Sequence, residues 1–181
     1  MFSKLPELPK EGAKVLLRRI ESRDLDELYS IESDPEVKRY LGGPVKLPRS
    51  EWIHRMESKL TNLLTIAVEC KADHQLAGRA AIAHTSLNNE CELQVVLAKA
   101  YWGCRLGRET AEMLIAAAFS ELGSEQVVGV VHPENEKSLD LLRSLGFQRV
   151  GEISDNSSQN GHLKFAVTHP HFYDHYQKET T

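Results

Sequence analysis

The stretch from Tyr101 to Glu109 has the composition of a turn that binds phosphate. It reads Tyr-Trp-Gly-Cys-Arg-Leu-Gly-Arg-Glu and lies between an apolar run and a strongly helical segment. A turn that opens a helix directs free backbone N–H groups, and the positive end of the helix dipole, at one point. Arg105 and Arg108 add guanidinium groups, which suit phosphate recognition. Neither a dinucleotide fingerprint nor a P-loop spacing is present, so an ordinary strand-to-helix turn remains the alternative.

A second group of polar residues follows at Asn135 and Ser138, before the sequence Leu145-Gly146-Phe147. Asn135 has a structural use, because an asparagine side chain at this place accepts the N–H of Ser138 and caps a helix. Ser138 taken alone is typical of a solvated residue in the first helical turn. Together, the two groups predict a domain that holds a phosphate-bearing cofactor and carries out chemistry beside it.

The segments around these residues predict a mixed order of strands and helices. Residues 1–13 are rich in proline and charge, and we expect an extended arm there, before a single domain over residues 14–181. Short apolar runs predict strands, and apolar residues at helical spacing predict helices. The expected strands cover residues 15–20, 63–69, 76–84, 91–97, 126–131, 147–153 and 162–168, and the expected helices 24–33, 50–60, 109–122 and 135–145. This order favours an α+β layered sheet over a doubly wound one.

The composition is that of an ordinary globular domain. The chain has 181 residues, of which 41% are hydrophobic and 27% charged, and it is long enough to bury one core. No apolar run approaches the roughly 20 residues of a membrane helix, and the N-terminus lacks a signal-peptide pattern. We therefore expect a cytoplasmic protein with no membrane partner. The net charge of −4 argues against a dedicated nucleic-acid binder. The three scattered cysteines indicate neither a disulfide framework nor a zinc site.

The two groups of residues together closely resemble the GNAT superfamily of acyl-CoA N-acyltransferases. The matching residues are Trp102-Gly103-x-x-Leu106-Gly107-x-Glu109, then Pro133-Glu134-Asn135-x-x-Ser138 and Leu145-Gly146-Phe147. Within the superfamily, the chain looks most like the RimJ/RimL-like branch, which acetylates the N-termini of ribosomal proteins. The resemblance implies one GNAT-like α+β domain with a mixed, mostly antiparallel sheet. That sheet is splayed between the strands at about 91–97 and 126–131 and is flanked by about four helices. The implied cosubstrate is acetyl-CoA, and the implied acceptor is a primary amine.

The resemblance implies a site for coenzyme A at the first motif. Family members hold its pyrophosphate in a turn of the form Gln/Arg-x-x-Gly-x-Gly/Ala, and here Arg105 stands at the middle glycine. Glycine there lets the backbone approach the pyrophosphate closely, whereas an arginine adds a Cβ and a guanidinium that could pair with a phosphate. The strand before the turn and Asn135 would hold the pantetheine arm. The implied cofactor-binding residues are Val95, Val96, Leu97, Trp102, Gly103, Cys104, Arg105, Leu106, Gly107, Arg108, Asn135 and Ser138.

Acetyl transfer needs a group that takes a proton from the amine and one that protonates or hydrogen-bonds the leaving thiolate. Many family members use a tyrosine seven residues after the asparagine as the acid, and here that position is Leu142. The resemblance therefore leaves that role to Ser138, which matches the serine that this branch keeps near the sulfur. Glu92 is the expected base, with a solvated strand-end carboxylate as the alternative. Glu69 and His132 are reserve bases.

The acceptor amine is expected between the first two helices and the final hairpin. There Glu27, Glu32 and Asp34 either supply negative charge or lie on a solvated helix face. No metal is expected, because the histidine-rich segment 169–175 lacks a third strong ligand at a diagnostic spacing. A monomer and a homodimer both remain open. Two other functions also remain open: a GNAT-fold module that senses acyl-CoA or has lost it, and an unrelated nucleotide-binding enzyme, against which the missing fingerprints argue.

Overall fold

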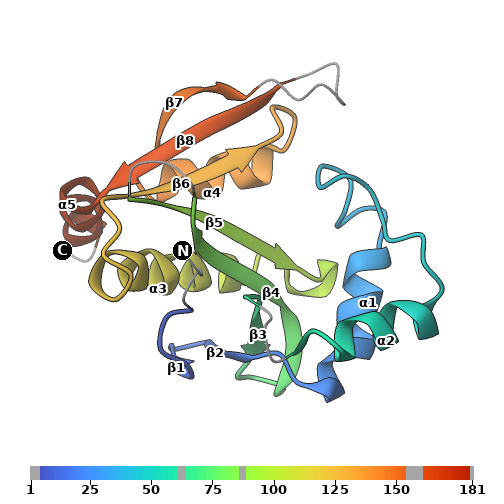
Figure 1. Cartoon of the computed structure of the whole chain (residues 1–181). Helices are drawn as coiled ribbons and strands as arrows, with labels where there is room; N and C mark the ends of the chain where they lie inside the picture. Colours follow the sequence, from blue (N-terminus) through green and yellow to red (C-terminus); the bar gives the residue numbers. More distant parts are fainter. Residues whose placement is uncertain (1–4, 61–63, 86–88, 154–160, 180–181) are drawn as a thin grey trace.

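The chain folds around one open sheet of eight strands in the computed structural model, which describes residues 5–60, 64–85, 89–153 and 161–179. The strands lie in the order β1-β2-β3-β4-β5-β6-β8-β7, and all neighbours are antiparallel except β5 and β6 (Figure 1). The expected mixed, mostly antiparallel α+β sheet is confirmed. The strands are β1 (Lys10–Glu11), β2 (Val15–Arg19), β3 (Ile66–Cys70), β4 (Gln75–His84), β5 (Glu90–Leu97), β6 (Gln126–Val131), β7 (Gln148–Ile153) and β8 (His162–Thr168). The α-helices are α1 (Leu25–Ser33), α2 (Arg49–Glu57), α3 (Leu106–Ser120), α4 (Glu136–Ser144) and α5 (His169–Glu179).

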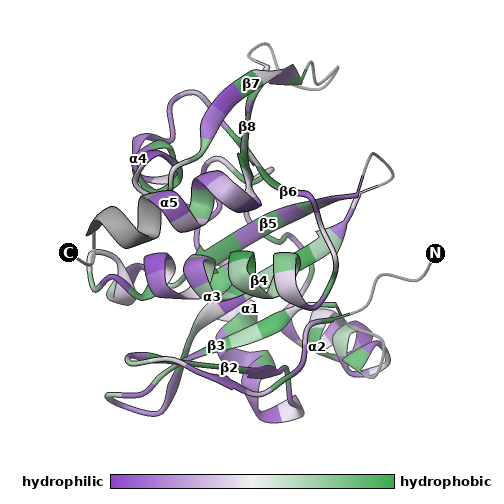
Figure 2. Ribbon diagram, turned by 90° about the vertical axis from the view of Figure 1, so that its left-hand side faces the viewer, coloured by the Kyte–Doolittle hydropathy of each residue, from purple (hydrophilic) through white to green (hydrophobic). Residues whose placement is uncertain are grey.

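The sheet separates two hydrophobic cores, one on each face. Successive residues of β3 alternate between them, because the side chains of a strand point to opposite faces. Ile66 and Val68 enter the first core, and Ala67 enters the second. Helices α3, α4 and α5 pack on the first core, and Figure 2 shows these three helices on the same face. Helices α1 and α2 pack on the second core, at the right-hand side of Figure 1.

The neighbouring strands β5 and β6 are paired only at their first residues. Their parallel register runs from Glu90 opposite Gln126 to Glu92 opposite Val128 and stops there. Each strand keeps its outer partner up to its last residue, β5 with β4 and β6 with β8. The two strands consequently part towards the right-hand side of Figure 1. The expected splay between them is confirmed.

The closed end of this gap is held by the buried carboxylate of Glu90. It accepts hydrogen bonds from Gln126 Nε2 on β6 at 2.7 Å and from Lys164 Nζ on β8 at 2.9 Å. Burial alone would raise the pKa of Glu90, but the bonds from Lys164 and Gln126 outweigh burial and lower it. The carboxylate therefore ties three neighbouring strands together at the point from which two of them part.

Helix α3 begins one turn earlier than the sequence predicts. Apolar spacing predicts a helix over 109–122, whereas the structure has it over Leu106–Ser120, with Gly123 at a φ of +66° beyond its end. Leu106 is 3% exposed, because its side chain joins the first core. Burial of this leucine extends the helix backwards. The N-terminus of α3 therefore lies directly at the candidate phosphate turn.

A fifth helix, α5, follows β8 without a break and adds to the expected set of about four helices. Phe172 anchors it to the first core at 4% exposure, with its ring centroid 6.1 Å from that of Phe119 on α3. Because the segment is rich in histidine, the apolar residue Phe172 did not indicate a helix in the sequence. Its burial becomes clear only in the folded chain. None of the described helices is both long enough and apolar enough to cross a membrane.

The N-terminal half contains smaller differences from the predicted elements. Within the expected arm, Lys10–Glu11 pair with β2 as β1. Helix α2 begins at Arg49, after Pro48, and not at Ser50, because proline lacks the N–H that a helix start leaves unpaired. Strand β3 begins at Ile66, and residue 63 of the expected strand lies outside the described residues.

Candidate active site

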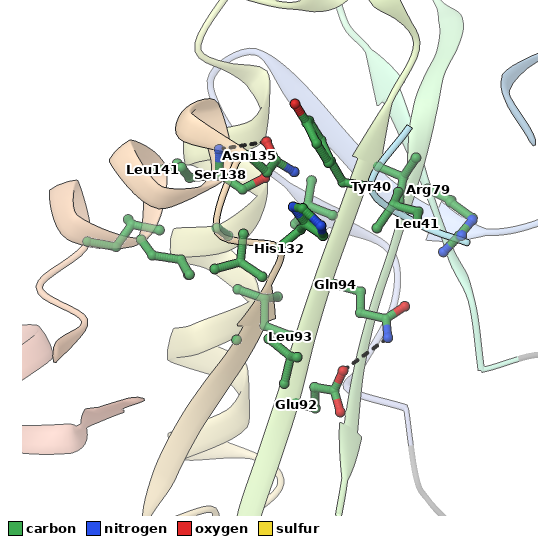
Figure 3. Close-up of a pocket in the computed structure, with 18 of the residues that line it drawn as sticks. Tyr40, Leu41, Arg79, Glu92, Leu93, Gln94, His132, Asn135, Ser138 and Leu141 are labelled. Atoms are coloured by element: carbon green, nitrogen blue, oxygen red, sulfur yellow. Dashed lines mark hydrogen bonds between the residues drawn. The ribbon is translucent and has the colours of Figure 1, made fainter. Parts of the chain in front are cut away.

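A pocket of about 270 Å³ opens where β5 and β6 part. Its walls come from these two strands, from the start of α4 and from the segment that joins α1 to α2 (Figure 3). Among the described residues, none of β7 or β8 lines the pocket, although the His162 ring of β8 lies 5.7 Å from that of the lining residue His132. The loop of the final hairpin, residues 154–160, where part of the acceptor site was expected, lies outside the described residues. The predicted site residues that the pocket brings together are Glu92, Val95, Val96, Asn135 and Ser138, with His132 beside them.

The turn before α3 forms a second part of the site, beyond the end of β5. The Trp102 indole N–H donates to the carbonyl of Leu97 at 3.0 Å, which fixes the turn to the strand. Lys137 Nζ lies 4.1 Å from the centroid of the Trp102 ring, so the first turn of α4 contacts the same tryptophan. The first N–H groups of α3, from Leu106 to Arg108, have no partner within the helix. Backbone donors therefore gather near the open end of the pocket.

Arg105 occupies the position that the family pattern gives to glycine, and its backbone adopts a glycine-like conformation. Its φ is +66° and its ψ is 6°, which is the left-handed region, and it is the N-cap of α3. The side chain is exposed and has no ion-pair partner among the described residues. Arg108 instead pairs with Glu112 one turn along α3, with Nε 2.8 Å from Oε1. The backbone at Arg105 thus has a conformation that glycine adopts readily, although the residue is an arginine.

Asn135 and Ser138 meet at the start of α4, on the wall of the pocket. The Asn135 Oδ1 atom accepts the backbone N–H of Ser138 at 3.3 Å, so the capping role suggested by the sequence is present. The cap leaves the Asn135 amide group and the Ser138 hydroxyl without a hydrogen-bond partner among the described residues. Both polar groups are therefore available to a molecule in the pocket (Figure 3).

Leu142, at the position of the tyrosine in many family members, is a packing residue. It is 8% exposed, and a Cβ on Gly129 of β6 would lie only 3.0 Å from its Cδ2 atom. The glycine allows α4 to approach β6 closely at this point. Leucine has no proton to donate, and Ser138 is the hydroxyl-bearing residue of α4 that lines the pocket among the described residues.

Glu92 is the last residue of β5 that pairs with β6, and its half-buried side chain lines the pocket. Its Oε1 atom accepts a hydrogen bond from Gln94 Nε2 at 3.1 Å, and both residues lie on the same face of the strand (Figure 3). The carboxylate has no cationic partner among the described residues. Its geometry fits a group that accepts a proton inside the pocket.

The two reserve bases differ in their surroundings. Glu69 does not line the pocket: its buried carboxylate accepts from Arg18 Nε at 2.7 Å, so it is a structural ion pair and not a base. His132 lines the pocket and stacks on Tyr40 with ring centroids 5.0 Å apart. Its Nδ1 atom accepts the N–H of Glu134 at 3.2 Å, which leaves the proton of the neutral ring on Nε2. The ring therefore presents a donor, and not a base, in this tautomer.

The pocket residues that escaped the sequence analysis include Lys38 and Tyr40, from the segment between α1 and α2, and Arg79 of β4. That segment has neither helical nor strand periodicity, and a single arginine in a strand does not indicate a binding site. Glu32, expected to be free or solvated, is 8% exposed and hydrogen-bonded to Lys38 and Arg79. It therefore offers no free negative charge to a cationic acceptor.

The histidine side chains described near the end of the chain contact other protein groups. The described residues contain no group of three or more histidine, cysteine, aspartate or glutamate side chains that could hold a metal ion. The His169 ring packs against Phe119, and His171 Nδ1 lies 3.0 Å from the Thr168 hydroxyl. The side chain of residue 175 lies outside the described part of the chain. Cys104 is an exposed thiol in the turn before α3.

The sequence and the fold both have known relatives. An uncharacterised N-acetyltransferase, p20, from Bacillus licheniformis is 27% identical over 157 residues, which cover 83% of this chain and 88% of that protein. The spermidine N(1)-acetyltransferase of Escherichia coli (strain K12) is 26% identical over 161 residues, covering 84% and 83%. The crystal structure of spermidine N-acetyltransferase from Vibrio cholerae in complex with CoA and spermine has a TM-score of 0.75 at 16% identity, over 90% of this chain and 99% of that one. This last similarity shows the fold alone.

The acetyltransferase (GNAT) domain model matches residues 14–148. That range contains both halves of the site: the parted strands with the turn before α3, and the first turn of α4. The match covers well over half of the sequence, and the parted sheet has the architecture that the family resemblance implies. The chain therefore belongs to the GNAT family and is an acetyltransferase.

Proposed function

We propose that the protein is an acetyl-CoA-dependent N-acetyltransferase that passes the acetyl group directly to a primary amine. The observation that carries the proposal is the gap between β5 and β6, which opens beside the N-terminus of α3. A long, thin molecule with a diphosphate at one end fits this arrangement. The diphosphate would bind the free amides at the helix start, and the arm would lie in the gap.

Coenzyme A would contact the backbone more than the side chains. The turn residues 102–108 would hold its pyrophosphate, and the backbone of Val95, Val96 and Leu97 would face the pantetheine arm. Val95 and Val96 line the pocket, whereas Leu97 is not among its lining residues. Beyond Glu92 the inner edge of β5 is not paired with β6, so its amide groups are free for this purpose. The unpartnered amide of Asn135 would complete the contact from the opposite wall.

Two side chains would move protons during the transfer. Glu92 would accept a proton from the amine, directly or through a water molecule, because its carboxylate lies in the pocket without a cationic partner among the described residues. The Ser138 hydroxyl would donate a hydrogen bond or a proton to the leaving thiolate of coenzyme A. The direct route needs no acyl-enzyme, so Cys104 has no part in it.

The acceptor belongs to the class of primary amines. The RimJ/RimL-like motif favours a protein N-terminus, whereas one relative of similar identity is a spermidine acetyltransferase. A second candidate function is a module that binds acyl-CoA without turnover. Arg105 in place of the family glycine and Leu142 in place of the family tyrosine support this second candidate.

The test is a calorimetric titration with acetyl-CoA, followed by measurement of thiol release with a panel of amines. We expect saturable binding, and thiol release that depends on one or more of the amines. Tight binding without release for any amine would favour the sensing module. The absence of binding would overturn both uses of coenzyme A.

A further inference from the structure

Two cationic side chains line one wall of the pocket, and we call this wall the acceptor wall (Lys38 and Arg79, with Glu32 behind them). Lys38 comes from the segment between α1 and α2, and Arg79 comes from β4. The side chains of Lys38 and Arg79 are 9% and 18% exposed. A buried charge is costly unless another charge compensates it, so the partners of these two cations decide what the wall binds.

One carboxylate serves both cations. Glu32 Oε2 accepts from Lys38 Nζ at 2.6 Å, and Glu32 Oε1 accepts from Arg79 Nε. Burial alone would raise the pKa of Glu32, but the hydrogen bonds from Arg79 and Lys38 lower it, so the group is ionised at neutral pH. Among the described residues, neither cation forms an ion pair with any other acid. The wall therefore has two positive charges and one negative charge, which gives it a net charge of +1.

The donors of Arg79 are also incompletely used. Glu32 takes its Nε–H, and the two terminal nitrogens of the guanidinium have no hydrogen-bond partner among the described residues. A guanidinium presents its donors in a planar fork that matches a carboxylate. In Figure 3, Arg79 lies on one side of Tyr40 and Leu41, and Asn135 and Ser138 lie on the other. The unused donors thus lie away from the proposed path of pantetheine.

We propose that the acceptor of this enzyme carries a carboxylate in addition to its amine, and that Arg79 and Lys38 bind this carboxylate. The inference rests on the proposed acetyltransferase function and names its substrate class. The proposed acceptor differs in charge from the polyamine that one relative acetylates. A polyamine would bring more positive charge to a wall that already has a positive excess.

The sheet register sets the length of such an acceptor. On β4 and β5, Arg79 lies opposite Val96 and Ala83 lies opposite Glu92, so the cation and the proposed base are four residues apart along one face. At about 3.3 Å per residue, their backbones are separated by roughly 13 Å. An acceptor whose amine and carboxylate are several atoms apart can reach both groups. A short peptide with a free C-terminus, or a peptide N-terminus with an acidic residue close behind it, meets the requirement.

The experiment compares matched acceptors in the thiol-release assay with the full chain. The first pair is Ala-Gly-Gly and its C-terminal amide, and the second is Ala-Asp amide and Ala-Asn amide. Spermidine is the polyamine probe. We expect the carboxylate member of one pair to have a kcat/KM about 10- to 100-fold above that of its neutral partner, the range for a charged hydrogen bond. If the two members of the first pair differ in kcat/KM, the recognised carboxylate is a C-terminus; if those of the second pair differ, it is a side chain.

The variant Arg79→Gln tests whether the wall causes the preference. It leaves Glu32 and Lys38 as a neutral pair, so the variant removes the excess positive charge without leaving a buried charge unpaired. We expect the kcat/KM ratio within the discriminating pair to fall by about tenfold or more. This ratio is independent of the fraction of folded enzyme. Lys38→Gln is the second variant, with Glu32 then paired to Arg79. Arg55→Gln, an exposed arginine on α2, is the control, and it should leave the ratio unchanged.

The outcomes separate this inference from the proposed function. Equal rates within both pairs, a preference for the neutral members, or a higher kcat/KM for spermidine would overturn the carboxylate inference and leave the acetyltransferase intact. An unchanged ratio in both Arg79→Gln and Lys38→Gln would also overturn it. Acetyl-CoA binding without release for any acceptor would overturn both.

Discussion

The turn before α3 offers backbone amides to a ligand, whereas the wall between α1 and β4 offers charged side chains. We call the first the donor region (Val95–Leu97, Trp102–Arg108 and Asn135–Ser138) and compare it with the acceptor wall of Lys38, Arg79 and Glu32. In the donor region most contacts depend on backbone shape. On the acceptor wall they depend on a charge balance among residues far apart in the sequence. Substitutions should therefore act through conformation in the first region and through electrostatics in the second.

The largest effect is expected at Glu92, which lines the same pocket but lies outside both regions. We predict that Glu92→Gln lowers kcat by about 100- to 10,000-fold, because an amide of the same shape accepts no proton. The Kd of acetyl-CoA should stay within about threefold, since Glu92 lies outside the donor region; calorimetry checks this. Glu57→Gln at the exposed end of α2 is the control. If the Glu92→Gln enzyme were fully active, a group other than Glu92 would have to act as the base.

The next effect is a loss of stability on the acceptor wall. Glu32→Gln leaves two buried cations without an ionised partner, and we expect the free energy of unfolding to fall by about 3–5 kcal/mol in urea denaturation. Glu51→Gln breaks an ion pair with Arg55 in which both side chains are about half exposed, and should cost less than about 1 kcal/mol. Equal losses in the two variants would contradict the importance of the buried wall.

The same carboxylate predicts a pH dependence. The pKa of Glu32 is lowered from its ordinary value of 4.5. A group with a lowered pKa in the folded state stabilises the fold above its unfolded pKa, and this stabilisation is lost as the pH falls through the folded pKa. The difference in stability between wild type and Glu32→Gln should therefore be constant above about pH 5 and should narrow below about pH 4.5. If the difference in stability between wild type and Glu32→Gln grew as the pH fell, the lowered pKa of Glu32 would be refuted.

The sequence predicted the donor region better than the acceptor wall, and the reason is physical. The cap at Asn135 and the start of α4 are local features, set by residues three positions apart, and the structure has them. The splay of β5 and β6 followed from the family resemblance. The wall depends on Glu32 meeting Arg79, 47 positions along the chain, and no local pattern encodes that pairing. Helix α5 was missed for the same reason, since Phe172 is apolar within a polar segment.

A moderate effect on kcat is expected at Ser138, where the side-chain hydroxyl and the backbone N–H have separate roles. The helix cap uses the N–H of Ser138 and not its side chain, so Ser138→Ala should leave the melting temperature unchanged. We expect kcat to fall by about 10- to 100-fold, the value of one hydrogen bond to a charged leaving group. Asn135→Ala is the contrasting variant, because it removes the cap and should cost about 1 kcal/mol of stability. A loss of stability in Ser138→Ala without a loss of kcat would reverse these roles.

The smallest effect concerns Arg105, and it tests whether the donor region depends on backbone shape. A left-handed conformation costs a non-glycine residue roughly 1–2 kcal/mol, and glycine's own backbone entropy offsets about half of that. Arg105→Gly should therefore raise the free energy of unfolding by about 0.5–1 kcal/mol in urea denaturation. Arg105→Ala keeps the Cβ and removes the guanidinium, so the two variants separate shape from charge. If amides carry the binding of pyrophosphate, the Kd of acetyl-CoA stays within about threefold in both variants, since an exposed charge contributes little. A tenfold loss in both would mean that the guanidinium holds a phosphate, and the contrast between a region of amides and a wall of charges would then disappear.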